Sequence, residues 1–385
     1  MNLMKHIAVI AAIGSIQGCT LAKTVLHNFA GLEDHRIFAN RTIASAREPS
    51  PLRALSRVPT FVAEMRVPDE EGNDWPLDQY LDDTRTAAFI VMHEDRIVYE
   101  RYARGYNERS LLNSLSIAKS VMATLVGIAV AEGRIASLDA IVADYRPDLA
   151  GTPYGAVTLK RLLTMTSGMG DPPTILPGRA QFYYGDDLHQ LIEDARPESR
   201  PDNGWRYSEA DVQVLGFVLE AAVGKSVSAY LAEKLWKPLG MESNALWALD
   251  REGGVEKAFC CISARARDFA RFGRLYLEGG RWNGEQLVPA DWAARSVLPG
   301  IRTLDGYTHQ HLWWTPAGGE GDFYAYGHNG QYLYVNPNAR VVIVKFSDGN
   351  RQDPVLMFRA VAGSLKLPGR IAELDRIEAP AIAAR

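Results

Sequence analysis

The spacing of apolar residues changes along the chain and predicts two kinds of element. Residues 87–102 contain two runs of β-branched and aromatic residues around the polar stretch H-E-D-R, which is the pattern of a β-hairpin. A segment that starts near Ser114 is apolar around most of its helical circumference. We therefore expect a central buried helix there.

Helical spacing then dominates to about residue 280. Residues 157–168, 211–224 and 228–240 each show it, and each segment ends in a glycine, the residue most common just past the last helical turn. Residues 263–280 predict a further helix with aromatic and aliphatic residues on one side.

Strand patterns return after about residue 310, followed by a last helix at residues 354–365. The strands are expected at residues 311–315, 322–330, 331–337 and 340–346. Because strands lie near the start and at the end of the chain with helices between them, we predict an α+β fold. One antiparallel sheet is built from both chain ends with flanking helices, a mostly helical lobe spans about 120–240, and a cleft lies between the two parts.

The chain divides into a leader, an arm, one main domain and a tail. Residues 1–19 contain one lysine, a short apolar run and small residues before Cys19, and I-Q-G-C resembles the cleavage box of a bacterial lipoprotein. We expect an exported protein, periplasmic or anchored to a membrane through a lipid on Cys19, with a cytoplasmic protein as the alternative. Residues 20–80 predict an arm on the main body, 81–370 the main domain and 371–385 a tail.

Composition narrows the function classes. The 385 residues carry a net charge of -4 without a long run of one sign, and nucleic-acid binders usually carry a basic stripe, so we expect no nucleic-acid partner. The chain has no H-E-x-x-H and no C-x-x-C pattern, so we expect no metal. Cys260 and Cys261 are adjacent, and ordinary disulfide geometry would be strained between neighbours. We therefore expect no bond between them.

The stretch N-S-L-S-I-A-K-S-V, residues 113–121, places Ser116 and Lys119 about one helical turn apart on one face. A serine hydroxyl is a poor nucleophile until a neighbouring base takes its proton. A lysine can do so when burial lowers its pKa, and an otherwise apolar helix is a suitable place for that. The alternative is a chance match in which Lys119 extends its ammonium to solvent. Asn113 and Ser114 are expected to cap the helix.

Two further stretches strengthen the catalytic interpretation. They are P-D-N-G-W-R-Y-S-E, with Tyr207 just before a predicted helix, and Y-G-H-N-G-Q-Y-L-Y-V, in which a strand carries H-N-G. In this order and context, the three stretches resemble the serine β-lactamase and penicillin-recognising superfamily. The resemblance is greatest to the class C β-lactamase-related branch, with its esterases, D-amino-acid peptidases and 6-aminohexanoate-dimer hydrolases. It covers roughly residues 80–365, and the arm at 32–43 is similar to the last subgroup.

The resemblance implies a role for each matched residue. Ser116 is expected to attack a carbonyl and become acylated, and Lys119 to accept or relay its proton. Tyr207 is expected to pass that proton to the leaving group and later to help activate water. The backbone N–H groups of Ser116 and Gln331 are expected to form the oxyanion hole. This chemistry implies no cofactor, and it leaves open whether Lys119 or Tyr207 is the base.

Two positions depart from the family's pattern. The family's Y-x-N is Y-S-E here, with Glu209 as its last residue, and the family's K-T-G is His328, Asn329 and Gly330. A neutral histidine holds the carboxylate of a β-lactam less well than a lysine does, and Glu209 would repel it. We therefore expect a small neutral or cationic ester or amide as substrate. The alternative interpretation of His328 is an ordinary strand histidine.

Other residues lie where the cleft is expected. Residues 181–188, Q-F-Y-Y-G-D-D-L, belong to the lobe that faces it, so Tyr184 is a candidate substrate contact. The alternative is a loop followed by a helix that one of the two aspartates caps. Of Trp313 and Trp314, one should lie in the core and the other can line the cleft, whereas Trp205 is expected to pack.

The first functional hypothesis is a serine hydrolase that cleaves a small ester or amide through an acyl-enzyme. The alternatives are a β-lactamase or D-amino-acid peptidase of the cell envelope, and a non-catalytic sensor that is acylated without turnover. The complete set of Ser116, Lys119 and Tyr207 favours the enzyme.

Overall fold

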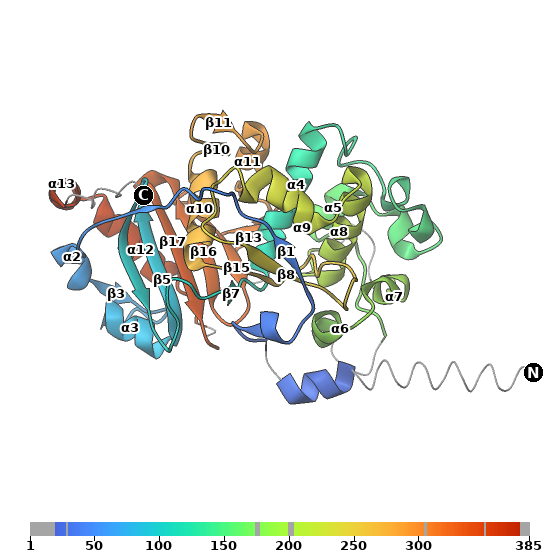
Figure 1. The fold of residues 1–385 in the computed structure, drawn as a ribbon, viewed down its shortest axis with the longest axis horizontal. Helices are drawn as coiled ribbons and strands as arrows, with labels where there is room; N and C mark the ends of the chain where they lie inside the picture. The colour runs from blue at the N-terminus through green and yellow to red at the C-terminus, as the bar shows by residue number, and fades with distance from the viewer. Residues whose placement is uncertain are drawn as a thin grey trace, which may run out of the picture.

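A large sheet forms one half of the molecule, and a group of helices forms the other (Figure 1). The computed structural model describes residues 20–27, 30–173, 178–198, 204–303, 306–349 and 352–377. The leader predicted at residues 1–19, with Cys19, lies outside the described residues. The predicted α+β class, with a sheet and a separate helical lobe, is confirmed.

The large sheet joins the two ends of the chain. Among the described residues it contains nine strands, in the order β12-β13-β14-β15-β16-β17-β5-β6-β2. The hairpin predicted around H-E-D-R is confirmed as β5 (Thr86–His93) and β6 (Arg96–Tyr102). The other strands are β2 (Arg53–Ala54), β12 (Ile301–Arg302), β13 (Thr308–Gln310), β14 (Trp313–Thr315), β15 (Phe323–Gly327), β16 (Gln331–Asn336) and β17 (Val341–Ser347). Antiparallel pairing of β17 with β5 brings the two chain ends together inside the sheet.

The prediction that a strand carries the H-N-G motif is wrong. His328, Asn329 and Gly330 form the turn between β15 and β16, whose last pair is Gly327 and Gln331. Asn329 has φ 63° and Gly330 has φ 89°. Asparagine and glycine tolerate this left-handed conformation, so the same residues that match a family motif also close the hairpin.

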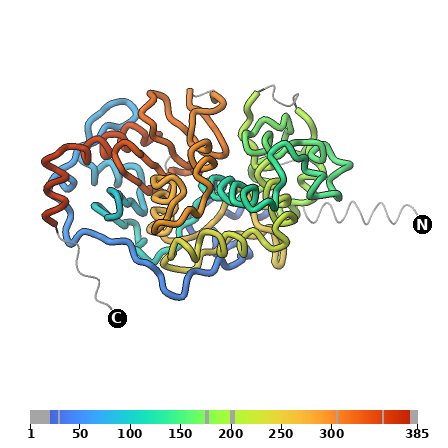
Figure 2. The backbone as a smooth tube through the Cα atoms, turned by 90° about the horizontal axis from the view of Figure 1, so that it is seen from above, coloured from blue at the N-terminus to red at the C-terminus, as the bar shows by residue number. Residues whose placement is uncertain are grey.

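Helices cover both faces of the sheet because its strands are apolar on both sides. Along β17, Val342 and Val344 face the core that includes α10 (Ala266–Leu277), whereas Val341 and Ile343 face α12 (Val355–Leu365) and α3 (Leu77–Asp83) on the other side. Figure 2 shows the sheet and the helical half side by side, with the N-terminal arm passing along both.

The helical lobe surrounds α4, the predicted central helix. Its members are α4 (Ile117–Ala131), α5 (Leu159–Thr164), α6 (Gly178–Tyr184), α7 (Leu188–Glu193), α8 (Glu209–Val223) and α9 (Val227–Leu231), which continues as a π-helical turn (Ala232–Trp236). All residues of α4 up to Ala129 are buried, as expected from its apolar circumference. Gly224 ends α8 with φ 67°, as predicted. The prediction that α5 ends at Gly168 is wrong, because Met165 already takes the left-handed conformation with φ 54°.

A small sheet ties the N-terminal arm to the segment before Ser116. Its strand order is β1 (Asn40–Ile43), β8 (Ala245–Ala248), β9 (Ile262–Ala264) and β7 (Leu112–Asn113). The remaining elements are α2 (Thr60–Ala63), β3 (Arg66–Pro68), β4 (Asp74–Pro76), β10 (Arg281–Trp282), β11 (Glu285–Gln286), α11 (Ala290–Ser296), α13 (Pro368–Arg376) and short 3₁₀ turns. Because β7 ends three residues before Ser116, this sheet determines where α4 begins.

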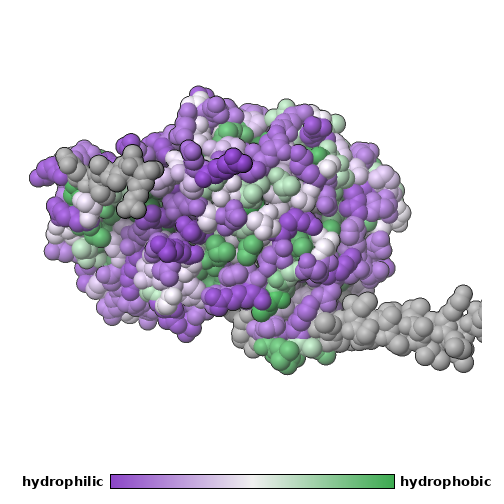
Figure 3. Space-filling model, viewed as in Figure 1, coloured by the Kyte–Doolittle hydropathy of each residue, from purple (hydrophilic) through white to green (hydrophobic). Residues whose placement is uncertain are grey.

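The surface in Figure 3 is mostly hydrophilic, with apolar side chains gathered at its lower edge. The helical residues 20–27 carry exposed Leu21, Val25 and Leu26. Within the described residues, no single helix has the length and apolar composition needed to cross a membrane. The segments Glu209–Val223 and Val227–Trp236 pass this test only as a pair bent by 71°.

The close contact between α10 and the sheet requires a glycine at position 273. A Cβ at Gly273 would lie 2.5 Å from Val342 Cγ1 and 2.7 Å from Leu333 Cδ1. We predict that Gly273→Ala lowers the free energy of unfolding by about 1–3 kcal/mol, because the helix must move off the strands. Denaturant titration measures this change.

Gly363 in α12 provides the matched control, since a Cβ there would have no neighbour within 4 Å. Gly363→Ala should stabilise the protein by about 0.5–1 kcal/mol, because alanine favours the helix. Equal effects of the two substitutions would contradict the packing argument.

Candidate active site

Ser116 begins α4 and keeps its hydroxyl free of the helix backbone. The prediction that Asn113 and Ser114 cap this helix is wrong: the N-cap is Ser116 itself, and its side chain makes no capping hydrogen bond. Asn113 and Ser114 instead fix the preceding turn. The Leu115 N–H donates to Asn113 Oδ1 at 3.1 Å, and the Ser114 N–H donates to Ile262 O at 2.8 Å. Leu115 is thereby held at φ 45°, and the Ser116 side chain faces a cavity.

Lys119 is buried beside Ser116 rather than extended to solvent. Lys119 is 2% exposed. Its Nζ donates to Ser116 Oγ at 2.9 Å and to Phe259 O at 2.7 Å. Nζ also lies 4.8 Å from the centroid of the Tyr207 ring. The surroundings of this amine are therefore one hydroxyl, one carbonyl and aromatic faces.

Burial and two charged neighbours shift the pKa of the Lys119 amine. Burial lowers the pKa of Lys119 to about 8; the Glu209 carboxylate opposes this shift and the Arg179 guanidinium adds to it. Near neutral pH a larger fraction of this amine is therefore neutral than of an exposed lysine. Such an amine can act as a base toward a hydrogen-bonded hydroxyl.

Tyr207 lies near Ser116 within the helical lobe. It lies just before α8, whose cap is Ser208, and its ring stacks on Trp314 with centroids 6.2 Å apart. Burial and the Glu209 carboxylate raise the pKa of Tyr207 well above its usual range, and the nearby Ser116 hydroxyl opposes this shift. Tyr207 is therefore a protonated phenol that can donate or relay a hydrogen.

A buried carboxyl, Asp211, holds the start of α8 in place. Ser167 Oγ and Tyr154 Oη donate to its Oδ1 at 2.7 and 2.9 Å, and the Asp211 N–H donates to Ser208 Oγ. Burial raises the pKa of Asp211 to about 7. The sequence analysis did not single out this residue. Its contacts join the loop after α5 to the residue that follows Tyr207.

Strand β15 meets the turn before Ser116 at Gly327. A Cβ there would lie 2.4 Å from Ser114 O and 3.2 Å from Leu115 Cβ, so only glycine allows this approach. The Gln331 side chain supports the adjoining turn, because Nε2 donates to His328 O at 3.1 Å and to Asn329 O at 3.2 Å. The sheet and α4 therefore meet directly beside the nucleophile candidate.

A cavity of about 440 Å³ lies where the two lobes meet. Five residues singled out from the sequence line it: Ser116, Tyr184, Tyr207, Glu209 and His328. The other candidates do not belong to its lining among the described residues: Lys119 lies beneath Ser116, and Asn329, Gly330 and Gln331 lie in the β15–β16 hairpin. The Asn329 side chain is buried and donates to Ala30 O at 2.7 Å. It therefore holds the N-terminal arm, and the oxyanion role of Gln331 stays a prediction.

Aromatic residues divide between core and cavity as expected, with one exception. Trp313 is fully buried against Tyr276, and Trp314 lines the cavity, which confirms the prediction that one of the pair is core. Trp205 was expected only to pack; it packs on Trp314 and also lines the cavity. Asp187 caps α7, as the alternative for that stretch predicted.

Arg179 of α6 is a cavity residue that the sequence analysis missed. Its Nε lies 3.8 Å from Glu209 Oε1, and its side chain is 69% exposed. The helical spacing of Arg179 and Tyr183, four residues apart, is the signal that could have placed it on the cavity side. The charge of Glu209 is thus only partly offset, because a solvent-exposed ion pair is weak.

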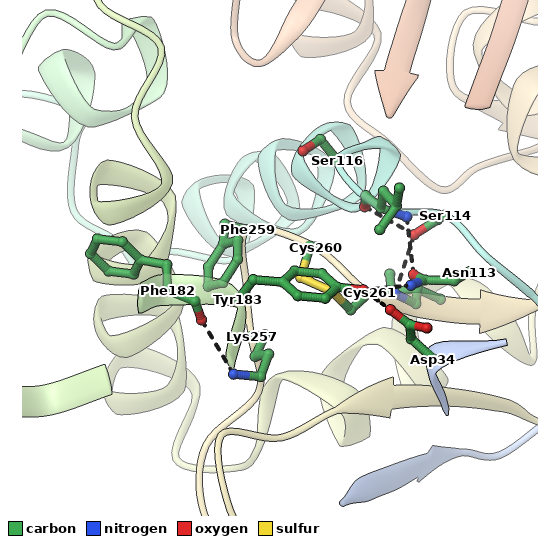
Figure 4. Close-up of a disulfide and its surroundings, with 12 residues drawn as sticks. Asp34, Asn113, Ser114, Ser116, Phe182, Tyr183, Lys257, Phe259, Cys260 and Cys261 are labelled. Carbon is green, nitrogen blue, oxygen red and sulfur yellow. Dashed lines mark hydrogen bonds between the residues drawn. A yellow bond between two sulfur atoms is a disulfide. The ribbon is translucent and has the colours of Figure 1, made fainter. Parts of the chain in front are cut away.

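The expectation for the adjacent cysteines is wrong, because a disulfide joins Cys260 and Cys261. Figure 4 shows it below the start of α4, where Ser116 lies, with Tyr183 nearby. The argument from ordinary disulfides fails because the backbone adapts: Cys261 takes φ 75°. Cys260 lines the cavity.

No group of three or more His, Cys, Asp or Glu side chains in the described part of the chain could hold a metal ion.

The two-lobed fold, with a serine beside a buried lysine at the head of the central helix, defines a serine hydrolase of the penicillin-recognising type. The profile of the Beta-lactamase family matches residues 77–365. The chain therefore belongs to the beta-lactamase family and is a hydrolase.

Three relatives refine this placement. The 6-aminohexanoate-dimer hydrolase of Paenarthrobacter ureafaciens is 28% identical over 330 residues, covering 79% of this chain and 81% of that protein. Esterase EstB of Burkholderia gladioli is 33% identical over 196 residues, covering 44% and 49%. A solved structure from Bacillus anthracis, provisionally described as a 6-aminohexanoate-dimer hydrolase, has a TM-score of 0.80 and 27% identity and covers 87% of this chain and 93% of that one.

Gly327 allows a direct test of how the sheet supports the site. We predict that Gly327→Ala lowers kcat/KM for any ester that the enzyme hydrolyses by about 10- to 100-fold, because the added Cβ displaces β15 from the turn before Ser116. Steady-state kinetics measures the loss, and circular dichroism verifies folding. Gly363→Ala is the control and should keep full activity. Unchanged kinetics in a folded Gly327→Ala protein would contradict the proposed contact.

Proposed function

We propose that this protein is a serine hydrolase that cleaves a small ester or amide through an acyl-enzyme on Ser116. The observation that carries the proposal is the 2.9 Å hydrogen bond between Lys119 Nζ and Ser116 Oγ, made by a lysine that is almost completely buried. The Tyr207 phenol lies close enough to the Ser116 hydroxyl to affect its own pKa, and the Tyr207 ring centroid is 4.8 Å from Lys119 Nζ. A hydroxyl, an amine and a phenol thus lie together at the cavity.

Acylation follows from this cluster. Neutral Lys119 takes the Ser116 proton as Oγ attacks the substrate carbonyl, and the C=O electron pair moves onto oxygen. Collapse of the tetrahedral intermediate expels the alcohol or amine, which receives a proton through Tyr207. Because Lys119 and Tyr207 contact the same serine, their protons titrate together rather than as independent groups.

Deacylation reverses the order, with water in place of the serine. The same Lys119–Tyr207 pair takes a proton from water, which attacks the acyl carbonyl and releases the acid and Ser116. The Ser116 N–H at the start of α4, where the helix dipole is positive, is proposed to stabilise the oxyanion together with the Gln331 N–H. Loss of one such donor typically raises the barrier by about 2.7–4 kcal/mol.

The cavity favours a neutral or cationic substrate. Aromatic rings from both lobes, including Tyr184 and Trp314, provide apolar walls, and Glu209 provides negative charge that the exposed Arg179 offsets only in part. His328 stands where lysine would help to bind the carboxylate of a β-lactam. We therefore propose small esters and amides, including amides of amino acids with a free amine, ahead of β-lactams.

Probe labelling and a substrate panel test this proposal. We predict that a fluorophosphonate probe labels the wild-type protein and not Ser116→Ala, because only the serine hydroxyl forms the covalent bond. Among p-nitrophenyl butyrate, the 6-aminohexanoate dimer and nitrocefin, the ester should be hydrolysed fastest and nitrocefin slowest.

Labelling that survives Ser116→Ala would eliminate the nucleophile assignment. Faster turnover of nitrocefin than of the ester would contradict the roles given to Glu209 and His328. Ser120→Ala is the matched control on the same helix, since the Ser120 hydroxyl donates to Leu312 O in the core and should not affect labelling.

The pH dependence of kcat/KM tests Lys119 as part of the base. Because the neutral amine is the active form, activity should rise with pH through about 8, the lowered pKa of Lys119. Glu209 raises the pKa of Lys119 and Arg179 lowers it. Glu209→Gln should therefore move the rising limb to lower pH, and Arg179→Gln should move it to higher pH. Profiles that stay in place, or that move in the same direction, would contradict this assignment.

A further inference from the structure

The Cys260–Cys261 disulfide belongs to a segment that contacts the proposed catalytic group at several points. Residues 257–262 form the last part of the connection from β8 to β9 together with the first residue of β9, and they pass beneath the start of α4 (Figure 4). Phe259 O accepts the hydrogen bond from Lys119 Nζ at 2.7 Å. The Cys261 N–H donates to Leu115 O at 3.3 Å, and Ile262 O accepts from the Ser114 N–H at 2.8 Å. This segment therefore contacts both Lys119 and the turn that presents Ser116.

The backbone of this segment has a conformation that side chains disfavour. Cys261 has φ 75°, in the left-handed region that favours glycine. The carbonyls on either side of it are fixed: Cys260 O accepts from Trp247 Nε1 at 2.9 Å, and Cys261 O accepts from the Ala248 N–H at 3.1 Å. The disulfide closes a small ring across this conformation and so restricts the chain next to Phe259.

The Phe259 carbonyl decides how the Lys119 amine is oriented. A neutral amine has one lone pair and two N–H groups. When one N–H is committed to Phe259 O, rotation about the Cε–Nζ bond is restricted, and the lone pair can be aimed at the Ser116 hydroxyl. The same carbonyl stabilises the protonated amine, because a hydrogen bond to the charged form favours it.

Other groups also act on this amine, from every element packed against it. They are Ser116 on its own helix, Tyr207 and Glu209 at the start of α8, Arg179 on α6 and His309 on β13. His309 is neutral, since burial and Lys119 lower the pKa of His309 to about 3. Only Phe259 O offers Lys119 a backbone acceptor in the described structure.

We propose that the Cys260–Cys261 disulfide is a positioning group for Lys119: by holding the Phe259 carbonyl against the amine, it keeps the base aimed at Ser116. The inference rests on the proposed function, because it assigns Lys119 as base. Reduction by a dithiol reagent breaks the S–S bond, adds two electrons and two protons to give two thiols, and converts the reagent into its cyclic disulfide. The reduced enzyme, while still folded, should therefore hydrolyse its substrate more slowly.

Two double variants test the proposal. Cys260→Ala with Cys261→Ala removes the disulfide and leaves a Cβ at the left-handed position. Cys260→Ala with Cys261→Gly removes the disulfide but lets the backbone keep φ 75° without that penalty. We expect the Ala/Ala protein to lose about 10- to 100-fold in kcat for p-nitrophenyl butyrate with little change in KM, and the Ala/Gly protein to recover part of the loss.

The pH profile supplies a readout that a merely structural role would not change. Without the Phe259 acceptor the protonated amine is less stable, so its pKa falls and the rising limb of kcat/KM moves to lower pH by about one unit in the Ala/Ala protein. The Ala/Gly protein should lie between this position and the wild type. Circular dichroism and thermal unfolding verify that both variants are folded.

Reduction of the wild-type enzyme gives an independent arm. After treatment with dithiothreitol, alkylation and mass spectrometry measure the reduced fraction, and lost activity should follow that fraction and return on reoxidation. The Ala/Ala protein is the control, and the reagent should leave its rate unchanged. If the native disulfide resists the reagent, the two variants decide; if they do not fold, the reduced enzyme decides.

The outcomes separate the two proposals. Wild-type kcat and an unmoved pH limb in the Ala/Ala protein would overturn the positioning role. A loss confined to KM that grows with the length of the acyl chain would also overturn it, since it would make the disulfide only a cavity wall. Failure of the oxidised wild-type enzyme to hydrolyse any ester or amide, without labelling of Ser116, would instead overturn the proposed function.

Discussion

The burial of one amine determines most of what surrounds it. Lys119 is 2% exposed, so a charge on its amine is not hydrated. Its hydrogen-bond partners are the Ser116 hydroxyl and the Phe259 backbone carbonyl. A buried ammonium without partners is costly, so both acceptors must be held in place. Helix α4 provides the hydroxyl, and the segment between β8 and β9 provides the carbonyl. The small sheet that joins β7 to β9 fixes these two supports relative to each other.

The sheet and the helical lobe meet at contacts that leave no room for adjustment. Gly327 touches the turn before Ser116, and Trp314 stacks on Tyr207. Neither contact belongs to a single lobe. The cavity therefore owes its shape to the packing of the two lobes, and its chemistry to the few polar groups that this packing leaves facing inward, which is usual for a binding site of this size.

Local patterns in the sequence predicted the parts whose causes are local. Apolar periodicity found α4 and the β5–β6 hairpin, and spacing on one helix paired Ser116 with Lys119. The missed features depend on contacts between distant segments. Arg179 lies near Glu209 only because α6 packs beside α8. The disulfide at Cys260 and the H-N-G turn went unpredicted because general rules for disulfides and motifs ignore the backbone conformation at each position.

The pairing of β17 with β5 has a consequence for how the protein is made. These strands are separated by about 250 residues, and β5 has no partner on its β17 side until the C-terminal part has been synthesised. Loop closure over such a distance is slow, and the unpaired edge of β5 is apolar. The sheet therefore cannot be completed until β17 has been synthesised. A chaperone that kept the nascent chain extended would act in the interval before that edge is covered.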